Sequence, residues 1–394
     1  MSIGEEWMRL KRGLGVYWRN DNMVQIGVDQ RVRIDVPLRG PGDLDMLLKL
    51  QNITTLPELR RILTGQGGQP QRAAILVRQL VEAGCMAPSE STGSARWDVP
   101  AEHREGMSPE AETRGLIEAD GWLAPAKRVK QRVSVYGLGR TGAQLAVHLA
   151  AAGVGILQLF DSAEVSGRDL GPVYRRKDIG KPRNQVLANF ITDGGFTSET
   201  RTRSRWAKPH VAVVVAYEVV SPERANFLTG HLVPHLPVVV DELSIACGPW
   251  VDPKAGPCVG CLNRWLAEKD PDWYRVATQQ WTKRCVSRRG EDSTLSSMAA
   301  SFGAAQVVTA LAGSDPNTLG RSVRFSMPDY SQQWTDHLPH PNCKLHGVSS
   351  VSNSLATGWR PWEVPRDPMI QPAGKATANR VGTSRAIGPK ARRT

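Results

Sequence analysis

Apolar residues in the first hundred positions alternate at first and then recur at helical spacing. Residues 24–28 alternate between apolar and non-apolar types, and the pattern returns over residues 32–36, which predicts a hairpin. Three short segments with helical spacing follow, at residues 44–48, 55–63 and 72–83. Met86 and then an extended segment at residues 97–99 would supply a closing strand. This order predicts a small winged-helix-like α+β domain over residues 1–105.

A strand, a helix and a second strand are predicted in direct succession after a linking helix at residues 106–130. The first strand is followed by the spacing G-x-G-x-x-G, made by Gly137, Gly139 and Gly142, and Asp161 comes directly after the second strand. Such glycines permit a tight turn and let a phosphate approach the helix N-terminus, and the acid can accept hydrogen bonds from ribose hydroxyls. The stretch therefore predicts a nucleotide-binding βαβ unit.

Helix and strand patterns continue to alternate after this unit. Helical spacing recurs at residues 181–191, 222–228 and 295–311, and apolar strand patterns occur at residues 211–216, 238–241, 323–326 and 332–334. Such alternation predicts a doubly wound, Rossmann-like α/β domain over residues 131–348. Residues 349–394 have no helical or strand period, and we expect them to form a flexible basic tail.

Composition and charge narrow the class of protein. The 394 residues are 40% hydrophobic, enough for a core, and no uninterrupted apolar run approaches the roughly 18 residues that a membrane helix needs. The first residues lack the features of a signal peptide, so we expect a cytoplasmic protein without membrane contact and with reduced cysteines. The net charge of +12 is uneven, because residues 371–394 contain six basic residues and no acidic one.

Two pairs of metal-ligand residues stand far apart in the chain. Cys258 and Cys261 have the C-x-x-C spacing, and Cys343 and His346 have the same interval with histidine as the second member. Four such ligands in two pairs suit tetrahedral zinc, in a closed site that stabilises the fold. His340 lies three residues before Cys343 and is the alternative fourth ligand. Buried thiols without a metal are the alternative to zinc.

Cys285 has no paired partner at ligand spacing. Basic residues flank it, and positive charge favours the thiolate. Two interpretations stay open, a nucleophilic or sulfur-accepting cysteine and an ordinary loop cysteine. The motifs assign no catalytic residue.

The motifs together resemble the ThiF-type, ubiquitin-activating-enzyme-like adenylyltransferase superfamily over residues 131–347. Four features carry the resemblance: the glycine motif, Asp161 with Val165, Ser166 and Leu170, the segment 178–181, and the two ligand pairs. The resemblance implies a homodimer with a Rossmann-like fold that takes ATP and magnesium. The residues that it implies for nucleotide binding are Gly137, Gly139, Arg140, Gly142, Asp161 and Lys181.

Within the superfamily the chain resembles an actinobacterial branch that joins such a domain to an N-terminal winged-helix peptide-recognition element. The segment at residues 256–262 and the sequence His-Pro-Asn-Cys at residues 340–343 suggest this branch. Its members bind the leader of a ribosomally made precursor peptide, as in bacteriocin biosynthesis, and present it to a ring-forming enzyme, a cyclodehydratase. The resemblance therefore implies a leader peptide and such an enzyme as partners.

Two stretches depart from the pattern of catalytic members. Where these carry Ser-Asn-Leu-x-Arg-Gln, this chain has residues 168–173, and Pro172 replaces the arginine expected at the ATP phosphates. Where they place an aspartate after the strand at residues 211–215, this chain has Ala-Tyr-Glu, with Glu218 as a substitute. Arg140 in the glycine turn would compensate in part. Since adenylyl chemistry depends on positioned positive charge, these changes predict a degenerate ATP site.

The sequence supports two main hypotheses. The first is a protein that binds a leader peptide and scaffolds dimerisation and a partner enzyme, with little catalysis of its own. The alternative is an active ATP-dependent adenylyltransferase that acts on the C-terminus of a peptide or sulfur carrier. A redox enzyme using NAD or FAD is supported by the glycine motif alone. Nucleic-acid binding is not favoured, since the helix at residues 72–83 offers only Arg72 and Arg78.

Overall fold

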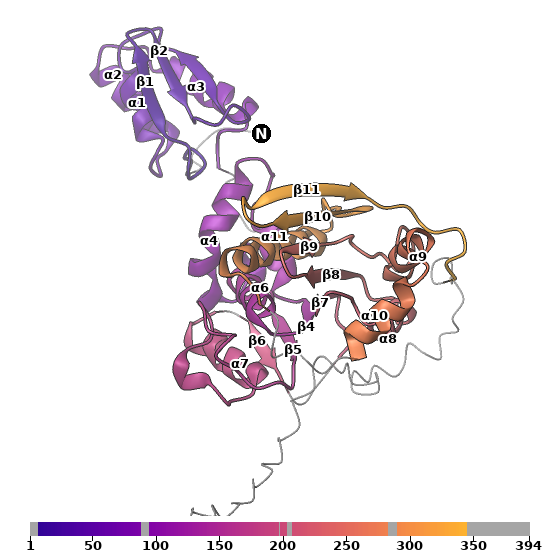
Figure 1. Cartoon of the computed structure of the whole chain (residues 1–394). Coiled ribbons are helices and arrows are strands. Elements are labelled where there is room, and N and C mark those ends of the chain that lie inside the picture. The colour runs from indigo at the N-terminus through magenta and orange to yellow at the C-terminus, as the bar shows by residue number, and fades with distance from the viewer. Residues whose placement is uncertain (1–6, 88–93, 197, 203–206, 283–289, 345–394) are drawn as a thin grey trace, which may run out of the picture.

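A small sheet with helices and a large mixed sheet with helices make up the described chain (Figure 1). The structure is a computed structural model, and it describes residues 7–87, 94–196, 198–202, 207–282 and 290–344. The predicted fold class is confirmed, because a small N-terminal α+β unit precedes a Rossmann-like sheet. Figure 1 shows the small unit projecting from the large one, with helix α4 between them.

The N-terminal unit is a three-stranded antiparallel sheet with three helices around one apolar core. Its elements are β1 (Val16–Asn20), β2 (Met23–Ile26), β3 (Ile34–Pro37), α1 (Asp43–Lys49), α2 (Leu56–Gly65) and α3 (Gln71–Glu82). The predicted hairpin is confirmed as β2 and β3, with Ile26 opposite Ile34. The sequence pattern does not predict β1, because this edge strand exposes Tyr17 and Trp18 instead of alternating apolar residues.

The prediction of a closing strand at residues 97–99 is wrong. Residues Ala95–Asp98 form a short 3-10 helix, η1, and the Ser94 hydroxyl accepts a hydrogen bond from the N–H of Arg96 at its start. A serine that caps a local N–H group stabilises a helical turn over an extended segment. An isolated bridge between Leu10 and Met86 lies at the end of the N-terminal unit instead.

The linking segment, predicted as a single helix at residues 106–130, consists of two helices, α4 (Ala101–Gly115) and α5 (Leu123–Arg128). Arg128 is fully buried, although the basic residues around it are typical of a solvated segment. Its guanidinium pairs with Glu110 of α4, and its Nε donates to the carbonyl oxygen of Ala152 at 2.8 Å. This buried arginine therefore ties both linking helices to the large unit.

The large sheet has eight strands in the order β11-β10-β9-β8-β7-β4-β5-β6. The strands are β4 (Arg132–Tyr136), β5 (Ile156–Phe160), β6 (Glu199–Arg201), β7 (Val211–Tyr217), β8 (His235–Val240), β9 (Ser244–Cys247), β10 (Arg321–Ser326) and β11 (Ser331–Asp336). The strands from β6 to β8 are parallel, and β9, β10 and β11 extend the sheet antiparallel. Since β5 and β7 flank β4 on opposite sides, the strand order reverses there, where doubly wound folds bind ligands.

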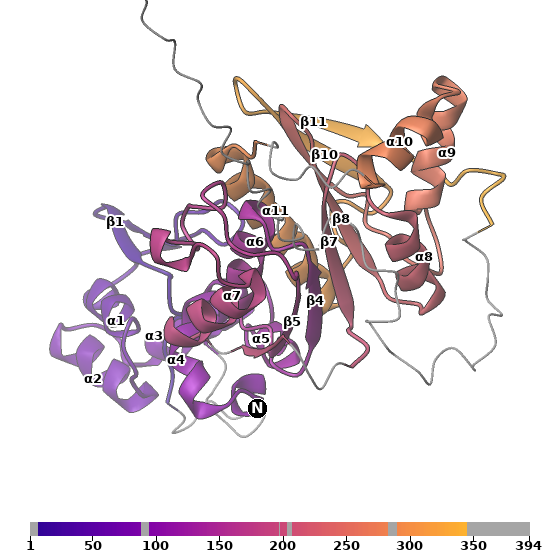
Figure 2. The same ribbon diagram turned by 60° about the horizontal axis from the view of Figure 1, so that its bottom comes forward.

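Helices cover both faces of this sheet, as Figure 2 shows. The helices of one face are α6 (Arg140–Ala151), α7 (Arg183–Asp193), which follows the short helix η2 (Arg176–Asp178), and α11 (Ser293–Ala312). Those of the other face are α8 (Pro222–Gly230), α9 (Val259–Lys269) and α10 (Trp273–Thr282). The sequence pattern predicts α6, α7, α8 and α11 but not α9 and α10.

Helix α11 is a core helix of the large unit. Among the described residues it is the one helix that is long and apolar enough to cross a membrane. It packs against α6, and Leu295, Ala299 and Val307 belong to the main apolar core. A Cβ at Gly303 would lie 2.9 Å from a methyl carbon of Leu145 on α6, so the two helices pack closely at this glycine and a side chain here would displace the leucine.

Candidate functional site

A turn with three glycines joins β4 to α6, at the edge of the sheet where its parallel strands have their carboxyl ends. Gly137 has a φ of +82°, and a Cβ there would lie 2.3 Å from the carbonyl oxygen of Val215. A Cβ at Gly142 would lie 1.9 Å from the carbonyl oxygen of Gly137. Because neither position has room for a side chain, the motif forms a tight strand-to-helix turn.

Asp161 follows β5 and lies beside this turn with its side chain buried. Its Oδ2 accepts a hydrogen bond from the N–H of Leu138 at 2.8 Å, and its Oδ1 accepts one from the N–H of Ala163 at 2.8 Å. The Nη1 of Arg183 donates to Oδ2 at 3.2 Å. Both carboxylate oxygens thus hold the glycine turn and the loop after β5, and the contact with ribose stays a prediction.

Arg183, the first residue of α7, is a charged residue that the sequence motifs do not single out. Its side chain is 9% exposed, and its Nη2 lies 2.6 Å from Oδ1 of Asp169, so that it bridges Asp169 and Asp161. Burial opposes its charge, but the two carboxylates outweigh that effect and raise the pKa of Arg183. Asp169 also accepts hydrogen bonds from the N–H and hydroxyl of Ser166. The loop that departs from the catalytic pattern is therefore anchored by a buried ion network.

The two cations predicted to contact the nucleotide, Lys181 and Arg140, are both engaged by other groups of the protein. The Lys181 side chain is 56% exposed, and its Nζ lies 3.5 Å from Oδ1 of Asp178 at a surface cavity of about 430 Å³. The Nη2 of Arg140 donates to the carbonyl oxygens of Arg168 and Leu170, at 3.0 and 2.8 Å. Within the described part of the chain, no hydrogen bond or ion pair joins Lys181 to the glycine turn. Arg140 therefore supports a loop backbone, and Lys181 lies at the surface.

Besides Asp161, the turn is contacted by Tyr217 at the end of β7 and by Glu291 just before α11. The Oε2 of Glu291 accepts a hydrogen bond from the N–H of Arg140 at 3.0 Å. Its Oε1 accepts from the N–H and the hydroxyl of Thr141, at 3.3 and 2.8 Å. The Tyr217 hydroxyl donates to Oε2 at 3.3 Å. Because Glu291 stands 151 residues beyond Arg140, no local spacing in the sequence signals this contact.

Three buried cysteines from distant parts of the chain come together beside the start of α9. The Sγ atom of Cys258 lies 3.7 Å from that of Cys261 and 3.7 Å from that of Cys343, and the three sulfurs lie within 4.8 Å of one another. Thiolates at about 2.3 Å from a tetrahedral zinc are about 3.8 Å apart, so the cluster fits three zinc ligands. Burial first, and then the neighbouring thiols, raise the pKa of Cys258 to about 12. A divalent cation would stabilise the thiolates instead.

His340 lies beside the cluster, but its ring is engaged by other groups. Its Nε2 lies 2.8 Å from Oε1 of Glu268, and its Nδ1 accepts a hydrogen bond from the N–H of Asn342 at 3.1 Å. The ring also packs edge-on against Trp265, with centroids 4.6 Å apart. Both ring nitrogens are therefore used within the protein. His346, the predicted fourth ligand, lies outside the described residues, as do Cys285 and the predicted tail.

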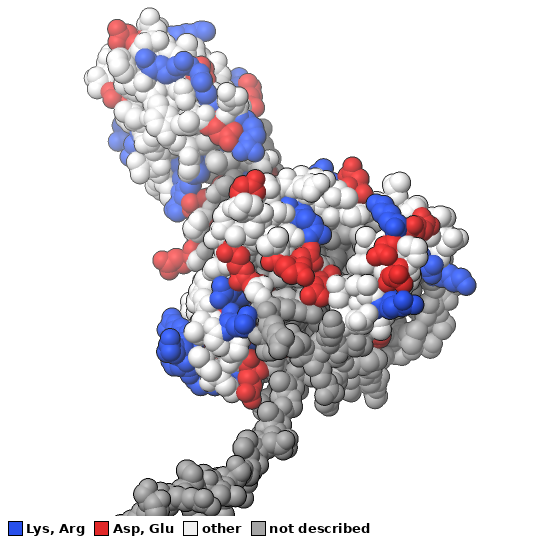
Figure 3. Space-filling model, viewed as in Figure 1, with Lys and Arg blue, Asp and Glu red and all other residues white. Residues whose placement is uncertain are grey.

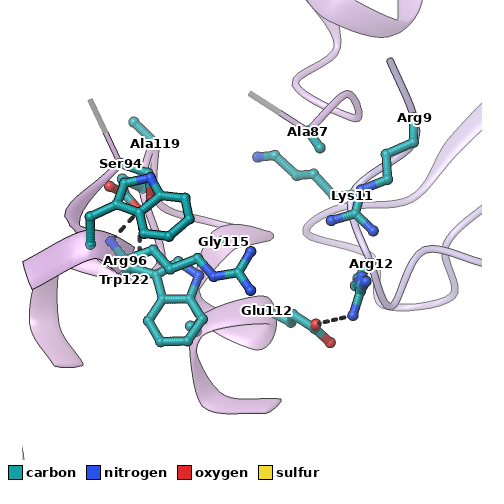
Figure 4. A pocket seen from close by; sticks show the side chains of 14 residues that line it. Arg9, Lys11, Arg12, Ala87, Ser94, Arg96, Glu112, Gly115, Ala119 and Trp122 are labelled. Atoms are coloured by element: carbon teal, nitrogen blue, oxygen red, sulfur yellow. Dashed lines mark hydrogen bonds and ion pairs between the residues drawn. The ribbon is translucent and has the colours of Figure 1, made fainter. Parts of the chain in front are cut away.

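A cleft lined by cations and aromatic rings lies between the N-terminal unit and the linking helices (Figure 4). Figure 4 shows Arg9, Lys11 and Arg12 on one wall, facing Arg96, Trp122 and Glu112 on the other. The Nη1 of Arg12 lies 3.0 Å from Oε1 of Glu112, and the Arg96 guanidinium lies 5.8 Å from the Trp122 ring centroid. Guanidinium and indole groups in one cleft suit acidic or aromatic side chains of a bound chain.

A second cavity, of about 740 Å³, opens between the sheet and helices α9 and α10. Glu218 and Asp241 reach it from the ends of β7 and β8, and Trp265 and Trp273 line its helical side. Figure 3 shows a hollow on this face with acidic side chains at its rim. Glu218, the predicted substitute for an aspartate of catalytic members, therefore lines this cavity, where its φ of +62° marks a left-handed backbone.

Arg72, one of the two residues that would contact DNA, is held inside the N-terminal unit. Its Nε lies 2.7 Å from both carboxylate oxygens of the fully buried Asp43, and its side chain is 18% exposed. Its Nη2 also lies 3.5 Å from the carbonyl oxygen of Pro37 at the end of β3. Of the predicted phosphate contacts on α3, this leaves only Arg78.

Comparison with known proteins identifies the fold. A search of curated protein sequences finds no match. The model of the ThiF family matches residues 118–220. The structure of E. coli MccB with ATP is 14% identical, with a TM-score of 0.60, over 86% of this chain and 100% of that chain.

Two further solved structures have the same fold. The structure of the microcin C7 biosynthetic enzyme MccB with N-formylated MccA is 14% identical, with a TM-score of 0.58, over 86% of this chain and 99% of that chain. The structure of PaaA is 15% identical, with a TM-score of 0.63, over 82% of this chain and 98% of that chain. Residues 118–220 therefore match the ThiF family model, and the N-terminal unit and the α/β sheet together have the fold of MccB and PaaA.

Proposed function

We propose that this protein binds the leader of a ribosomally made precursor peptide and scaffolds its modification, with a degenerate ATP site. One observation carries the proposal. A small sheet-and-helix unit precedes a ThiF-type fold, in the arrangement of MccB, whose structures include one in complex with N-formylated MccA. A homodimer, a ring-forming partner enzyme and a cytoplasmic location belong to this proposal.

The peptide would add to the sheet along the outer edge of β3. Strand β2 lies between β1 and β3, and in the described chain no strand pairs with the outer edge of β3. Arg72 of α3 contacts the end of β3, and Ile75, one turn further along the same face of α3, is 52% exposed. An open edge offers main-chain hydrogen bonds to an extended peptide, and an apolar neighbour offers a side-chain contact.

The charges around the glycine turn support a degenerate ATP site. Adenylation requires positive groups positioned at the phosphates. Here Arg183 is bound by Asp161 and Asp169, Arg140 is bound by carbonyl oxygens, and Pro172 stands where catalytic members carry an arginine. The charge of Arg183 is thus compensated by carboxylates, one nitrogen of Arg140 is held by the loop backbone, and the arginine replaced by Pro172 is missing.

A titration of the full chain with a fluorescently labelled precursor peptide, chosen from the short genes neighbouring its own, tests the proposal. We expect micromolar or tighter binding, and we expect Ile75→Asp to weaken it about tenfold, because apolar anchors dominate such interfaces. Val81→Asp is the matched control, since Val81 is a similarly exposed (54%) apolar residue about 120° round the same helix. Absence of binding at high micromolar peptide, or equal losses in both variants, would contradict the proposal.

The alternative function is an active ATP-dependent adenylyltransferase that acts on a peptide or sulfur-carrier C-terminus. The ThiF match and the intact glycine turn favour it. It predicts pyrophosphate exchange that depends on the precursor peptide and is lost in Lys181→Ala. Exchange at a rate typical of adenylating enzymes would establish this alternative, and its absence with a peptide that binds would support the scaffold.

A further inference from the structure

The first N–H groups of helix α6, where a nucleotide phosphate would bind, are already bonded to a carboxylate of the protein. Glu291 accepts the N–H groups of Arg140 and Thr141, the first two residues of α6, together with the Thr141 hydroxyl. The N–H of Leu138 donates to Asp161. A helix N-terminus binds anions because its N–H groups have no partner within the helix. Here a glutamate has the position and the charge of that anion.

The space above the second glycine of the motif is filled as well. In a nucleotide-binding turn this glycine has no side chain, so that a pyrophosphate can approach the backbone. A Cβ at Gly139 would lie 3.0 Å from the Tyr217 hydroxyl oxygen and 3.6 Å from Oε2 of Glu291. Tyr217 and Glu291, bonded to each other at 3.3 Å, therefore occupy the approach to this glycine. This observation is independent of the hydrogen bonds to α6.

The charges beside the turn also disfavour a second anion. Three carboxylates, of Asp161, Asp169 and Glu291, stand against two guanidinium groups, of Arg140 and Arg183. The charge of Arg183 is compensated by Asp161 and Asp169, and the Nη2 of Arg140 is bonded to two carbonyl oxygens of the loop after β5. A polyphosphate at the turn would add negative charge beside Glu291 and would have to displace it.

We propose that Glu291, supported by Tyr217, is a built-in substitute for a phosphate that closes the glycine turn to phosphorylated ligands. The glycine motif then serves to seat the end of β7 and the start of α11 rather than a nucleotide. The inference deepens the proposed function, whose degenerate ATP site it explains, but it does not depend on peptide binding.

Binding of inorganic pyrophosphate and of MgATP to the full-length protein, measured by calorimetry, tests the proposal. We expect no measurable binding to the unmodified chain and a gain of at least tenfold in affinity in Glu291→Ala. Tyr217→Phe, which removes only the hydroxyl, should give a smaller gain. Glu242→Ala is the matched control, because it removes an exposed carboxylate from the same unit and changes the net charge equally. Equal gains in Glu291→Ala and Glu242→Ala would reduce the effect to net charge and overturn the proposal.

A measurement on the unmodified chain keeps the test valid if Glu291→Ala fails to fold. Hydrogen exchange should show the Arg140 and Thr141 amides protected, and excess pyrophosphate should leave their exchange unchanged. Tight binding of pyrophosphate with a change at these amides would overturn the proposal. If Glu291→Ala binds the precursor peptide as tightly as the unmodified chain does, the two proposals stand separately. If the unmodified chain does not bind the peptide, only the proposed function is affected.

Discussion

Cys343→Ser is expected to abolish metal binding and to destabilise the large unit strongly. Cys343 brings the end of the described chain to Cys258 and Cys261 at the start of α9. Binding of structural zinc contributes roughly 10–16 kcal/mol in small zinc domains, so the loss of one thiolate should cost several kcal/mol here. We expect one zinc per chain in the unmodified protein by elemental analysis, little or none in the variant, and a clearly lower melting temperature.

Three further variants identify the ligands. Cys247→Ser is the matched control, because Cys247 is buried in the same unit but its thiol bonds to the carbonyl oxygen of Ala299 at 3.6 Å. The zinc content of this variant should equal that of the unmodified protein. His340→Ala should also retain the metal, since its ring is held by Glu268 and Asn342. His346→Ala should lose it. The cysteines would instead be a metal-free thiol cluster if the unmodified protein contained no zinc and the Cys343→Ser variant had the same melting temperature.

The features that could be predicted from the sequence are those encoded by local spacing. The glycine turn depends on three glycines within six residues, and two of the three clustered cysteines, Cys258 and Cys261, form a C-x-x-C pair, so a pattern can show both. Hairpin β2–β3 follows from the alternation of apolar and polar residues, and helix α11 follows from apolar residues at helical spacing. In these cases the residues that carry the pattern are near one another in the chain, and only the place of Cys343 beside Cys258 depends on a distant segment.

The features that could not be predicted depend on partners far apart in the sequence. Glu291 reaches the glycine turn from 151 residues away, and its flanking residues have no motif. Arg128 is surrounded by basic residues typical of the surface, yet its partners Glu110 and Ala152 bury it. Only the tertiary fold decides which charged residues are enclosed, and a buried ion pair has no period of its own.

Replacement of Arg183 by methionine is expected to be the most destabilising change at the candidate nucleotide site. Methionine keeps most of the side-chain volume but leaves the carboxylates of Asp161 and Asp169 buried without their shared cation. Removal of one partner from a buried ion pair typically costs about 3–5 kcal/mol, because an uncompensated charge remains. We expect a loss of this size in the free energy of unfolding, measured by urea titration.

Lys181→Ala is the control that separates this effect from a general loss of positive charge. Its side chain is 56% exposed, and Asp178 is its one ion-pair partner among the described residues, so we expect a change of at most about 0.5 kcal/mol. Arg183→Lys should fall between the two, since an ammonium group keeps the charge but cannot bridge two carboxylates with separate nitrogens. If Arg183→Met were as stable as Lys181→Ala, the arginine would not be stabilising the fold. Its pairing with Asp161 and Asp169 would then be available to exchange for a phosphate, which would favour the adenylyltransferase over the scaffold.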